Sequence, residues 1–442
     1  MNKKVIHTLF VALILALCLS LSVGILFTAP TQSGGNEKLS DFPTLKTKDG
    51  KINADYLGQV SAWIEDHFLF RQEWISLHNW LNGKVFGTSG NADVILGADG
   101  WLYYADTLSD YTGTDPMSDR ELFEATRNLQ LIQQYCGENN RKFLFMIAPN
   151  KNSLYGESMP NYGYVAEHTN GQRLMERLKD SGVQTVDLFE HFRQQDEVLY
   201  FSHDSHWNTK GAAFGADLIV AGFGLESNYY GGDFSQKTPH TGDLFEMLYP
   251  AFADTEQDYV YGGKLEYGFT TSATRPDAIV LSTESNGHGT LLAYRDSFGN
   301  LLFPFLANTF ASARFARSAA YDLTYEADYV LIELVERNLR QLTKNLPIMP
   351  APEVTLDLPS EIAGKITAEA SERSELLQIK GMLPAVDADS PIYVVCADGT
   401  YEAFCLEETG FGLSVDTESK PNFAICKQNG VFVAYEIEIT NK

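Results

Sequence analysis

A run of six apolar residues, Phe143-Leu144-Phe145-Met146-Ile147-Ala148, constrains the fold of this chain more than any other stretch. A strand that is apolar on both faces must be covered on both faces, as in a parallel sheet flanked by helices. Similar strand-like segments, with helical segments between them, lie at 183–188, 278–281, 291–294 and 329–334. This alternation predicts an α/β fold with a mainly parallel sheet and helices on both faces.

The segments before this sheet follow helical and hairpin patterns. Residues 56–81 carry apolar side chains at helical spacing, which predicts a helix that packs its aromatic residues into a core. Residues 94–104 predict a strand, a turn at Asp99-Gly100 and a second strand. Ser118 and Glu121 form a capping box, which opens a helix that extends to about Cys136.

Two polar motifs carry the chemistry. In the first, Asp204 precedes His206 by two residues, a spacing that places both side chains on one side of an extended segment. In the second, Ser297 follows the apolar strand at 291–294. A serine hydroxyl becomes a good nucleophile when a histidine takes its proton and a carboxylate orients that histidine. The three side chains therefore predict an Asp-His-Ser relay.

Two other readings of this motif remain open on the residues alone. Asp204 and His206 also fit an ordinary polar turn that caps the helix after it. His203, Asp204 and His206 are all capable of binding a metal ion. The sequence has no helical His-Glu-x-x-His pattern and no clear cluster for a third ligand, so we predict no metal and no other cofactor.

Five motifs, in order, support one family resemblance over roughly residues 50 to 345. They are Gly100-Trp101-Leu102-Tyr103, Pro149-Asn150-Lys151, Asp204-Ser205-His206-Trp207-Asn208 with the small-residue helix at 209–213, Asp296-Ser297-Phe298, and Glu333-Leu334-Val335-Glu336-Arg337. Together they resemble the alginate O-acetyltransferase family and its Gram-positive DHHW relatives. These are SGNH-hydrolase-like enzymes in which the aspartate and histidine precede the serine in the chain.

The resemblance implies an extracytoplasmic enzyme that transfers acetyl groups to hydroxyls of a secreted or cell-surface polysaccharide. Ser297 would be the nucleophile, His206 the base and Asp204 its orienting partner. The residues expected to bind the oxyanion or the substrate are Lys151, Trp207, Arg317 and Asn338. The implied acetyl supplier is a membrane-bound O-acyltransferase.

Two alternatives to this function stay open. A carbohydrate acetylesterase would use the same relay with water as the acceptor. A non-catalytic glycan-binding or envelope-assembly protein would keep the fold without the reaction. The distance between Ser297 Oγ and the His206 ring separates the catalytic readings from the non-catalytic one.

The N-terminus predicts a membrane segment. Residues 1–30 contain an apolar run from Val5 to Ala29, preceded by Lys3 and Lys4, and about 20 apolar residues are enough to cross a bilayer. The two lysines favour a cytoplasmic N-terminus, so the rest of the chain would lie outside the cell membrane. A cleaved signal peptide is the competing interpretation. Residues 31–50 are expected to be a linker, and 51–345 the catalytic domain.

A second domain is predicted after the proline-rich stretch at 347–352. From residue 353 to 442 apolar residues alternate with period two between short turns, which predicts a small β-sandwich that is either carbohydrate-binding or structural. Three of the five cysteines lie in this part; one disulfide is compatible with them, but the spacing fits no zinc site. A net charge of −25 argues against nucleic acid as a partner.

Overall fold

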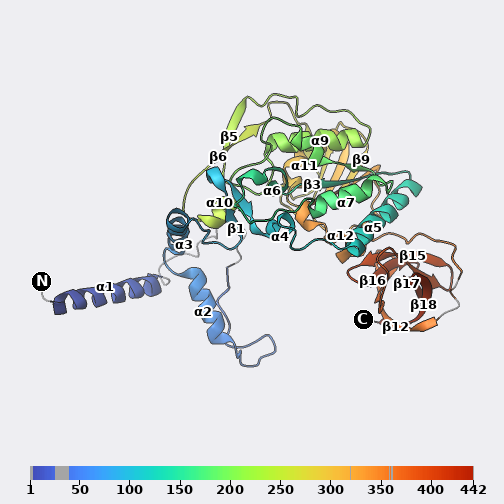
Figure 1. The fold of residues 1–442 in the computed structure, drawn as a ribbon, viewed down its shortest axis with the longest axis horizontal. Coiled ribbons are helices and arrows are strands. Elements are labelled where there is room, and N and C mark those ends of the chain that lie inside the picture. Colours follow the sequence, from blue (N-terminus) through green and yellow to red (C-terminus); the bar gives the residue numbers. More distant parts are fainter. Residues whose placement is uncertain (1–2, 25–38, 319, 358, 360–361, 442) are drawn as a thin grey trace.

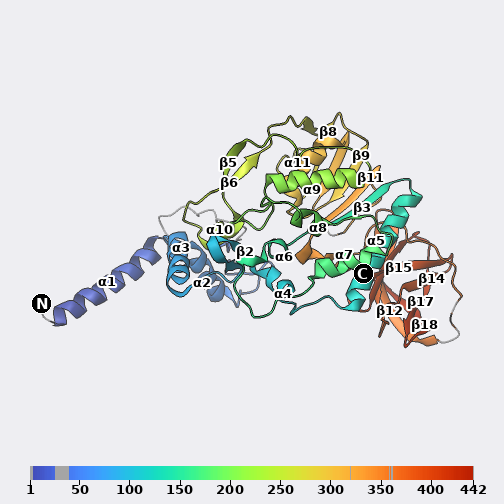
Figure 2. The same ribbon diagram turned by 45° about the horizontal axis from the view of Figure 1, so that its top comes forward.

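The computed structural model describes residues 3–24, 39–318, 320–357, 359 and 362–441, and it describes no side chains for 17–24 and 441. Two globular parts follow an N-terminal helical region (Figures 1 and 2). The larger part is built on a seven-stranded sheet, and the smaller C-terminal part is a closed β-barrel.

The central sheet confirms the predicted α/β class. Its strand order is β4-β3-β11-β9-β10-β8-β7. The first five strands are parallel to one another, whereas β8 pairs antiparallel with both β10 and β7. The strands are β3 (Lys142–Ala148), β4 (Thr185–Val186), β7 (Tyr267–Phe269), β8 (Val280–Ser285), β9 (Thr290–Tyr294), β10 (Ser312–Ala316) and β11 (Tyr329–Val335).

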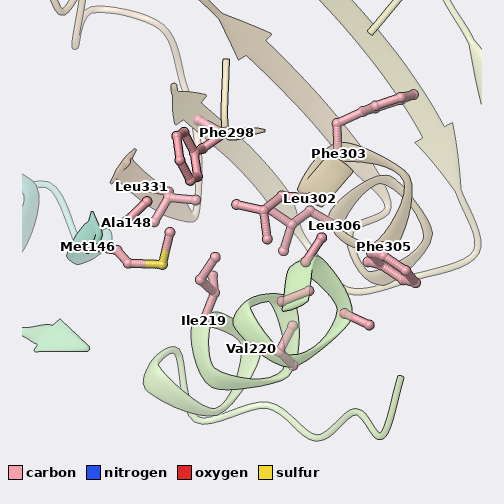
Figure 3. Close-up of a cluster of buried hydrophobic side chains, with 14 of the residues drawn as sticks. Met146, Ala148, Ile219, Val220, Phe298, Leu302, Phe303, Phe305, Leu306 and Leu331 are labelled. Atoms are coloured by element: carbon pink, nitrogen blue, oxygen red, sulfur yellow. The ribbon is translucent and has the colours of Figure 1, made fainter. Parts of the chain in front are cut away.

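Helices cover both faces of this sheet, as the apolar run predicts. Side chains of β3 alternate between two cores: Phe145 packs with α5 and α7 on one face, and Met146 packs with α9 and α11 on the other. In Figure 3, Ile219 of α9 faces Leu302 of α11. The helices are α5 (Asp119–Glu138), α7 (Asn170–Lys179), α8 (Leu188–Arg193), α9 (Thr209–Gly222), α11 (Gly299–Thr309) and α12 (Gln341–Lys344).

Short elements surround the carboxyl ends of the parallel strands. The predicted strand pair is present as β1 and β2, which pair antiparallel. Ser118 and Glu121 form the predicted capping box at the start of α5. The short elements are β1 (Val94–Leu96), β2 (Leu102–Tyr104), α4 (Leu108–Tyr111), α6 (Lys151–Leu154), β5 (Gln236–His240), α10 (Asp243–Leu248), β6 (Glu256–Val260) and a 3-10 turn at Glu336–Asn338.

The helical region before the sheet differs from the prediction. The expected single helix is two helices, α2 (Tyr56–His67) and α3 (Arg71–Leu81), because the chain turns at Phe70, whose φ is +60°. Its aromatic residues do not enter a core: Trp74 is 41% exposed, whereas the polar Ser76 and Asn79 are buried. The prediction was wrong because α3 contacts the domain through polar side chains, including the hydrogen bond from Asn79 Nδ2 to Leu248 O.

The predicted membrane segment falls partly outside the described residues, which omit 1–2 and 25–38. A helix, α1 (Lys3–Gly24), occupies the remainder. Within the part of the chain that the structure describes, no helix meets the length and apolarity needed to cross a membrane.

The C-terminal β domain is a barrel rather than the two packed sheets of a sandwich. Strand β12 pairs antiparallel with β13 and parallel with β18, and this second pairing closes the sheet on itself. Residues 354–356, the start of the alternating pattern in the sequence, form a connecting segment and not a strand. The barrel strands are β12 (Ile362–Arg373), β13 (Leu376–Met382), β14 (Ile392–Cys396), β15 (Thr400–Leu406), β16 (Gly410–Val415), β17 (Pro421–Gln428) and β18 (Val431–Asn441).

The barrel is joined to the larger part through α5. Arg127 Nε and Nη2 donate to the two carboxylate oxygens of Glu402, at 2.5 and 2.6 Å. Asn128 exchanges hydrogen bonds with the backbone of Cys405, a buried residue. The cysteines whose side chains are described, Cys136 and the three in the barrel, are buried free thiols.

Candidate active site

The segment that carries Asp204 and His206 is a tight loop between two buried aromatic residues. Tyr200 and Trp207 form an antiparallel bridge, and the amide of Asn208 donates to Leu199 O. The Asn208 side chain then caps α9 by accepting from the amide of Gly211. These bonds hold the loop at both ends, so the two-residue spacing in the sequence becomes a fixed side-chain geometry.

Glycine is required where this loop meets its neighbours. A Cβ on Gly211 would lie 2.4 Å from Leu199 O, and a Cβ on Gly242 would lie 2.2 Å from His203 O. Any side chain at either position would push the loop away from the rest of the site.

Ser297 stands at the carboxyl end of β9, just before α11 begins at Gly299. The amides on either side of it are occupied: Asp296 N donates to Glu333, and Phe298 N donates to the Asp296 carboxylate. The Ser297 amide has no hydrogen-bond acceptor among the described residues. It is therefore available to a ligand.

The structure brings the three predicted relay residues into one hydrogen-bonded line. His206 Nε2 lies 2.8 Å from Ser297 Oγ, and His206 Nδ1 lies 2.7 Å from Asp204 Oδ1. Asp204 and Ser297 come from segments that are far apart in sequence but meet at the same edge of the sheet. This arrangement can draw the proton of the serine hydroxyl onto the imidazole.

Asp204 is held as a carboxylate by four donors. Its Oδ1 accepts from the His206 amide and faces His206 Nδ1, while its Oδ2 faces His240 Nε2 at 2.9 Å and accepts from the Asp243 amide at 3.1 Å. Burial alone would raise the pKa of Asp204, but the charge of His206 and the hydrogen bonds from both histidines hold that pKa well below its usual value.

Opposing effects act on the pKa of His206. Burial lowers the pKa of His206, but the negative charge of Asp204 outweighs it, so the net pKa is raised. The positive charge of the Arg337 guanidinium lowers the pKa of His206. The imidazole can therefore be protonated and deprotonated in turn, as a base that later acts as an acid must be.

Two residues of this network were missed by sequence reasoning. His240 stacks on Phe201, with ring centroids 4.0 Å apart, and contacts Asp204. Asp243 accepts from both the amide and the hydroxyl of Ser205. Both residues lie more than 30 positions after Asp204, and no motif spacing connects them to it.

Lys151 and Trp207 do not lie where the sequence prediction placed them. Lys151 is 4% exposed, and its Nζ donates to the carbonyls of Phe201, Ser202 and Asp204 at 2.7 to 3.2 Å. All three N–H groups of the ammonium donate to carbonyls of this loop, so none is left for a substrate. Trp207 is fully buried and donates to Phe298 O. We therefore correct both predicted substrate contacts to packing roles.

Arg317 and Asn338 do line the cleft with Ser297. Asn338 Nδ2 donates to Asp296 Oδ2 at 2.9 Å, so it positions the residue before the serine. Arg317 is exposed and donates to Asp277 O. A third residue, Arg337, belongs to the last of the five family motifs, and the sequence predicted no separate role for it. Its guanidinium lies over the rings of Tyr104 and Phe298 and has no acidic partner among the described residues.

The cleft has a volume of about 660 Å³. Its walls combine the relay with charged side chains of both signs. They include Tyr104, Asp106, Ser109, Asp110, Ser205, His206, Asp243, Ser297, Arg317, Glu336, Arg337, Asn338 and Arg340.

One group of side chains in this cleft resembles a metal-ligand set. Asp204, His206 and Asp243 offer ligand atoms within 4.8 Å of one another, the one such group among the described residues. Both ring nitrogens of His206 already face protein partners, however. A metal ion here would have to displace either Asp204 or Ser297 from the imidazole.

A buried carboxyl pair supports the floor of the cleft. Glu336 accepts from the Asn150 amide, the Ser153 hydroxyl and the Thr169 hydroxyl, and so ties together the loops after β3 and β11. Burial, and then the nearby Asp110 carboxylate, raise the pKa of Glu336 to about 7. The segments at 150–153 and 169–171 are thus held by a carboxyl group whose pKa is raised.

Comparison with known proteins agrees with the resemblance predicted from the sequence. Residues 94–251 match the family model described as the SGNH hydrolase-like domain of the acetyltransferase AlgX. Asp204 and His206 lie inside the matched region, and Ser297 lies beyond it. No curated protein sequence matches this chain.

Several solved structures are similar to this chain at low sequence identity. PatB1 of Bacillus cereus, with a sulfonyl adduct, is 20% identical, with a TM-score of 0.43 over 56% of this chain and 97% of that chain. A DHHW family protein of Eubacterium siraeum is 16% identical, with a TM-score of 0.39 over 51% of this chain and 89% of that chain. AlgX of Pseudomonas aeruginosa is 12% identical, with a TM-score of 0.39 over 78% of this chain and 92% of that chain.

Proposed function

We propose that this chain is an O-acetyltransferase that moves acetyl groups onto hydroxyls of a secreted or cell-surface polysaccharide, with Ser297 as the nucleophile. The observation that carries the proposal is the continuous line from Ser297 Oγ through His206 to Asp204, with contacts of 2.8 and 2.7 Å, at an open cleft. The match of residues 94–251 to an acetyltransferase domain supports acyl transfer as the reaction class.

In the first half-reaction, Ser297 Oγ attacks the carbonyl carbon of an acetyl ester or thioester donor. The hydroxyl proton passes to His206 Nε2, and Asp204 stabilises the imidazolium cation. The bond between the carbonyl carbon and the donor oxygen or sulfur then breaks, and His206 returns the proton to that leaving atom. The product of this step is an acetyl ester on Ser297.

The tetrahedral intermediate requires donors for its negative oxygen. The unpaired amide of Ser297 is one such donor, since the amides on both sides of it are already engaged. The Arg337 guanidinium supplies positive charge in the same cleft.

In the second half-reaction, a sugar hydroxyl replaces the leaving group. His206 Nε2 takes the proton of that hydroxyl, whose oxygen attacks the acetyl carbon. The bond between that carbon and Ser297 Oγ then breaks, and His206 returns the proton to Oγ. Water in the same position would give hydrolysis, so an acetyl esterase differs only in its acceptor. We further propose that residues 1–30 anchor the chain in the cell membrane and that a membrane-bound O-acyltransferase supplies the acetyl group.

The test uses the full-length chain with a chromogenic acetyl ester as donor and oligosaccharides as acceptors. The Ser297→Ala and His206→Ala variants remove the nucleophile and the base. Ser312→Ala and His288→Ala are matched controls, because both residues are exposed and lie outside the residues that line the cleft.

We expect acetyl release to fall by about 10³-fold or more in the two relay variants and to stay unchanged in the two controls. Acetylated oligosaccharide in the product, identified by mass spectrometry, supports transfer; free acetate alone supports the esterase. Acetyl release by Ser297→Ala at the wild-type rate would refute the proposed nucleophile.

A further inference from the structure

A second depression adjoins the cleft. It has a volume of about 730 Å³ and is lined by Ala105, Asp106, Leu108, Ser109, Thr112, Thr114, Tyr162 and Tyr164. Asp106 and Ser109 line both this depression and the cleft that contains Ser297. We call the depression the tyrosine groove. The two spaces therefore lie next to each other.

The tyrosine groove presents aromatic rings to solvent. Tyr162 is 40% exposed and Tyr164 is 65% exposed, although tyrosine side chains that serve only packing are usually more buried. Neither tyrosine hydroxyl, nor the hydroxyl of Ser109, has a hydrogen-bond partner among the described residues. The groove therefore offers flat apolar surfaces next to free hydroxyl groups.

This surface is held in place by the backbone beneath it. The Ala166 amide donates to Tyr111 O at 2.9 Å, which ties the segment carrying both tyrosines to α4. A Cβ on Gly113 would lie 3.6 Å from Cε1 of Tyr164, so the ring lies directly over this glycine. Thr112 Oγ1 donates to Leu108 O and approaches Thr114 Oγ1. The Tyr164 ring is thus presented in a defined position before any ligand arrives.

The charge of the groove restricts the chemistry of its ligand. Among the described side chains that line it, Asp106 is the one with a charge, and it is acidic. A polyanionic ligand would be repelled, whereas a neutral sugar chain offers C–H faces for the rings and hydroxyls for the polar groups.

We propose that the tyrosine groove is a subsite for a neutral polysaccharide, which binds the part of the acceptor chain that extends beyond the sugar at Ser297. The inference rests on the proposed transferase function, since it takes the acceptor to be a glycan. Tyr162 and Tyr164 stack on sugar rings, and Ser109 contacts the chain where it enters the cleft. The subsite then favours polymers over monosaccharides as acceptors.

The test measures binding by calorimetry with the full-length chain and without acetyl donor. The probes are a neutral β-linked glucose hexasaccharide, a neutral N-acetylglucosamine hexasaccharide and an anionic hexagalacturonate. The variants are Tyr162→Ala, Tyr164→Ala and the conservative Tyr164→Phe. Tyr325→Ala is the matched control, because Tyr325 is 43% exposed and does not line either space.

We expect at least one neutral hexasaccharide to bind, with an affinity that falls about 5- to 10-fold in each alanine variant at the groove. Tyr164→Phe and Tyr325→Ala should bind like wild type. The proposal is overturned if no neutral probe binds, if the alanine variants bind them as wild type does, or if hexagalacturonate binds more tightly than both neutral probes.

Turnover of the chromogenic acetyl ester separates this proposal from the transferase function. Ester turnover should require Ser297 and should stay at the wild-type rate in the Tyr325→Ala control. If ester turnover does not depend on Ser297 while glycan binding still depends on Tyr164, the proposed function fails and the subsite stands.

Discussion

Replacing Lys151 with methionine tests how the site is held together. The ammonium group of Lys151 is buried under the loop of Asp204 and His206 and donates to three of its carbonyls. Methionine keeps a similar length and its contacts with the rings of Trp101 and Tyr103, over which the ammonium lies at 5.5 and 5.1 Å. The substitution therefore removes the three hydrogen bonds and the buried positive charge.

The expected loss of stability follows from two opposing effects. Ser202 O keeps a second donor, the Leu102 amide, so only the carbonyls of Phe201 and Asp204 lose theirs. Each buried carbonyl left without a donor costs about 1–3 kcal/mol, which gives roughly 2–6 kcal/mol for these two. Burial lowers the pKa of Lys151 from 10.5 to about 8, so removing the ammonium relieves a penalty of about 3 kcal/mol. We expect the free energy of unfolding of Lys151→Met to fall by about 1 kcal/mol.

Urea unfolding of the full-length chain measures this change, with Lys179→Met, an exposed helical lysine, as the control. Because the loop loosens, kcat for the chromogenic ester should fall by about 10- to 100-fold while KM changes little. Unchanged stability together with a raised KM would refute the reasoning and return Lys151 to the substrate-binding role predicted from sequence.

The pH dependence gives an independent check on Lys151. Its pKa is lower in the folded chain than in the unfolded chain, so the unfolded chain binds one more proton between about pH 8 and 10.5. The stability of wild type should therefore rise with pH across this window relative to Lys151→Met. An identical pH slope in both proteins would contradict the burial of the ammonium group.

Three further substitutions test other contacts. Arg337→Gln removes the charge that lowers the pKa of His206, so the acidic limb of the kcat/KM profile should move to higher pH and kcat should fall about 10-fold; an unmoved limb would refute this. The folded Glu336 carboxyl holds its proton up to about pH 7, so wild type should lose stability as pH rises from about 4.5 to 7. Glu336→Gln should not show this loss, because glutamine does not titrate. Urea unfolding at about pH 5 and pH 8 measures the difference. Glu402→Gln should lower the free energy of unfolding by about 2 kcal/mol, because Arg127 loses a charged partner; an unchanged urea midpoint would show that this contact does not stabilise the barrel junction.

Patterns within one segment predicted much of the α/β part. The apolar run at 143–148 became a central strand, because six apolar residues in a row cannot leave either face in water. The capping box at Ser118 and Glu121 formed as expected, since both of its hydrogen bonds lie within one turn. The helical pattern at 56–81 misled the prediction, because periodicity shows that a helix has an apolar face but not what that face contacts.

The same limit explains the barrel and the corrected site residues. Alternating residues in the last part of the chain predict strands with one buried face, and these suit a sandwich or a barrel equally well. Closure depends on the parallel pairing of β12 with β18, the first and last strands of the domain. Lys151 also illustrates the limit, because its position after a strand predicts the correct edge of the sheet but not the direction of the side chain.

The sequence by itself determined the mainly parallel sheet, the two-residue spacing of Asp204 and His206, and the position of Ser297 after a strand. Only the tertiary structure decided that His206 lies 2.8 Å from a serine 91 residues away. It also decided that His240 and Asp243 hold Asp204, and that Lys151 faces the loop instead of the cleft. The physical reason is that local hydrogen bonds and apolar periodicity act within a segment, whereas the partners of a buried polar group are set by how separate segments pack.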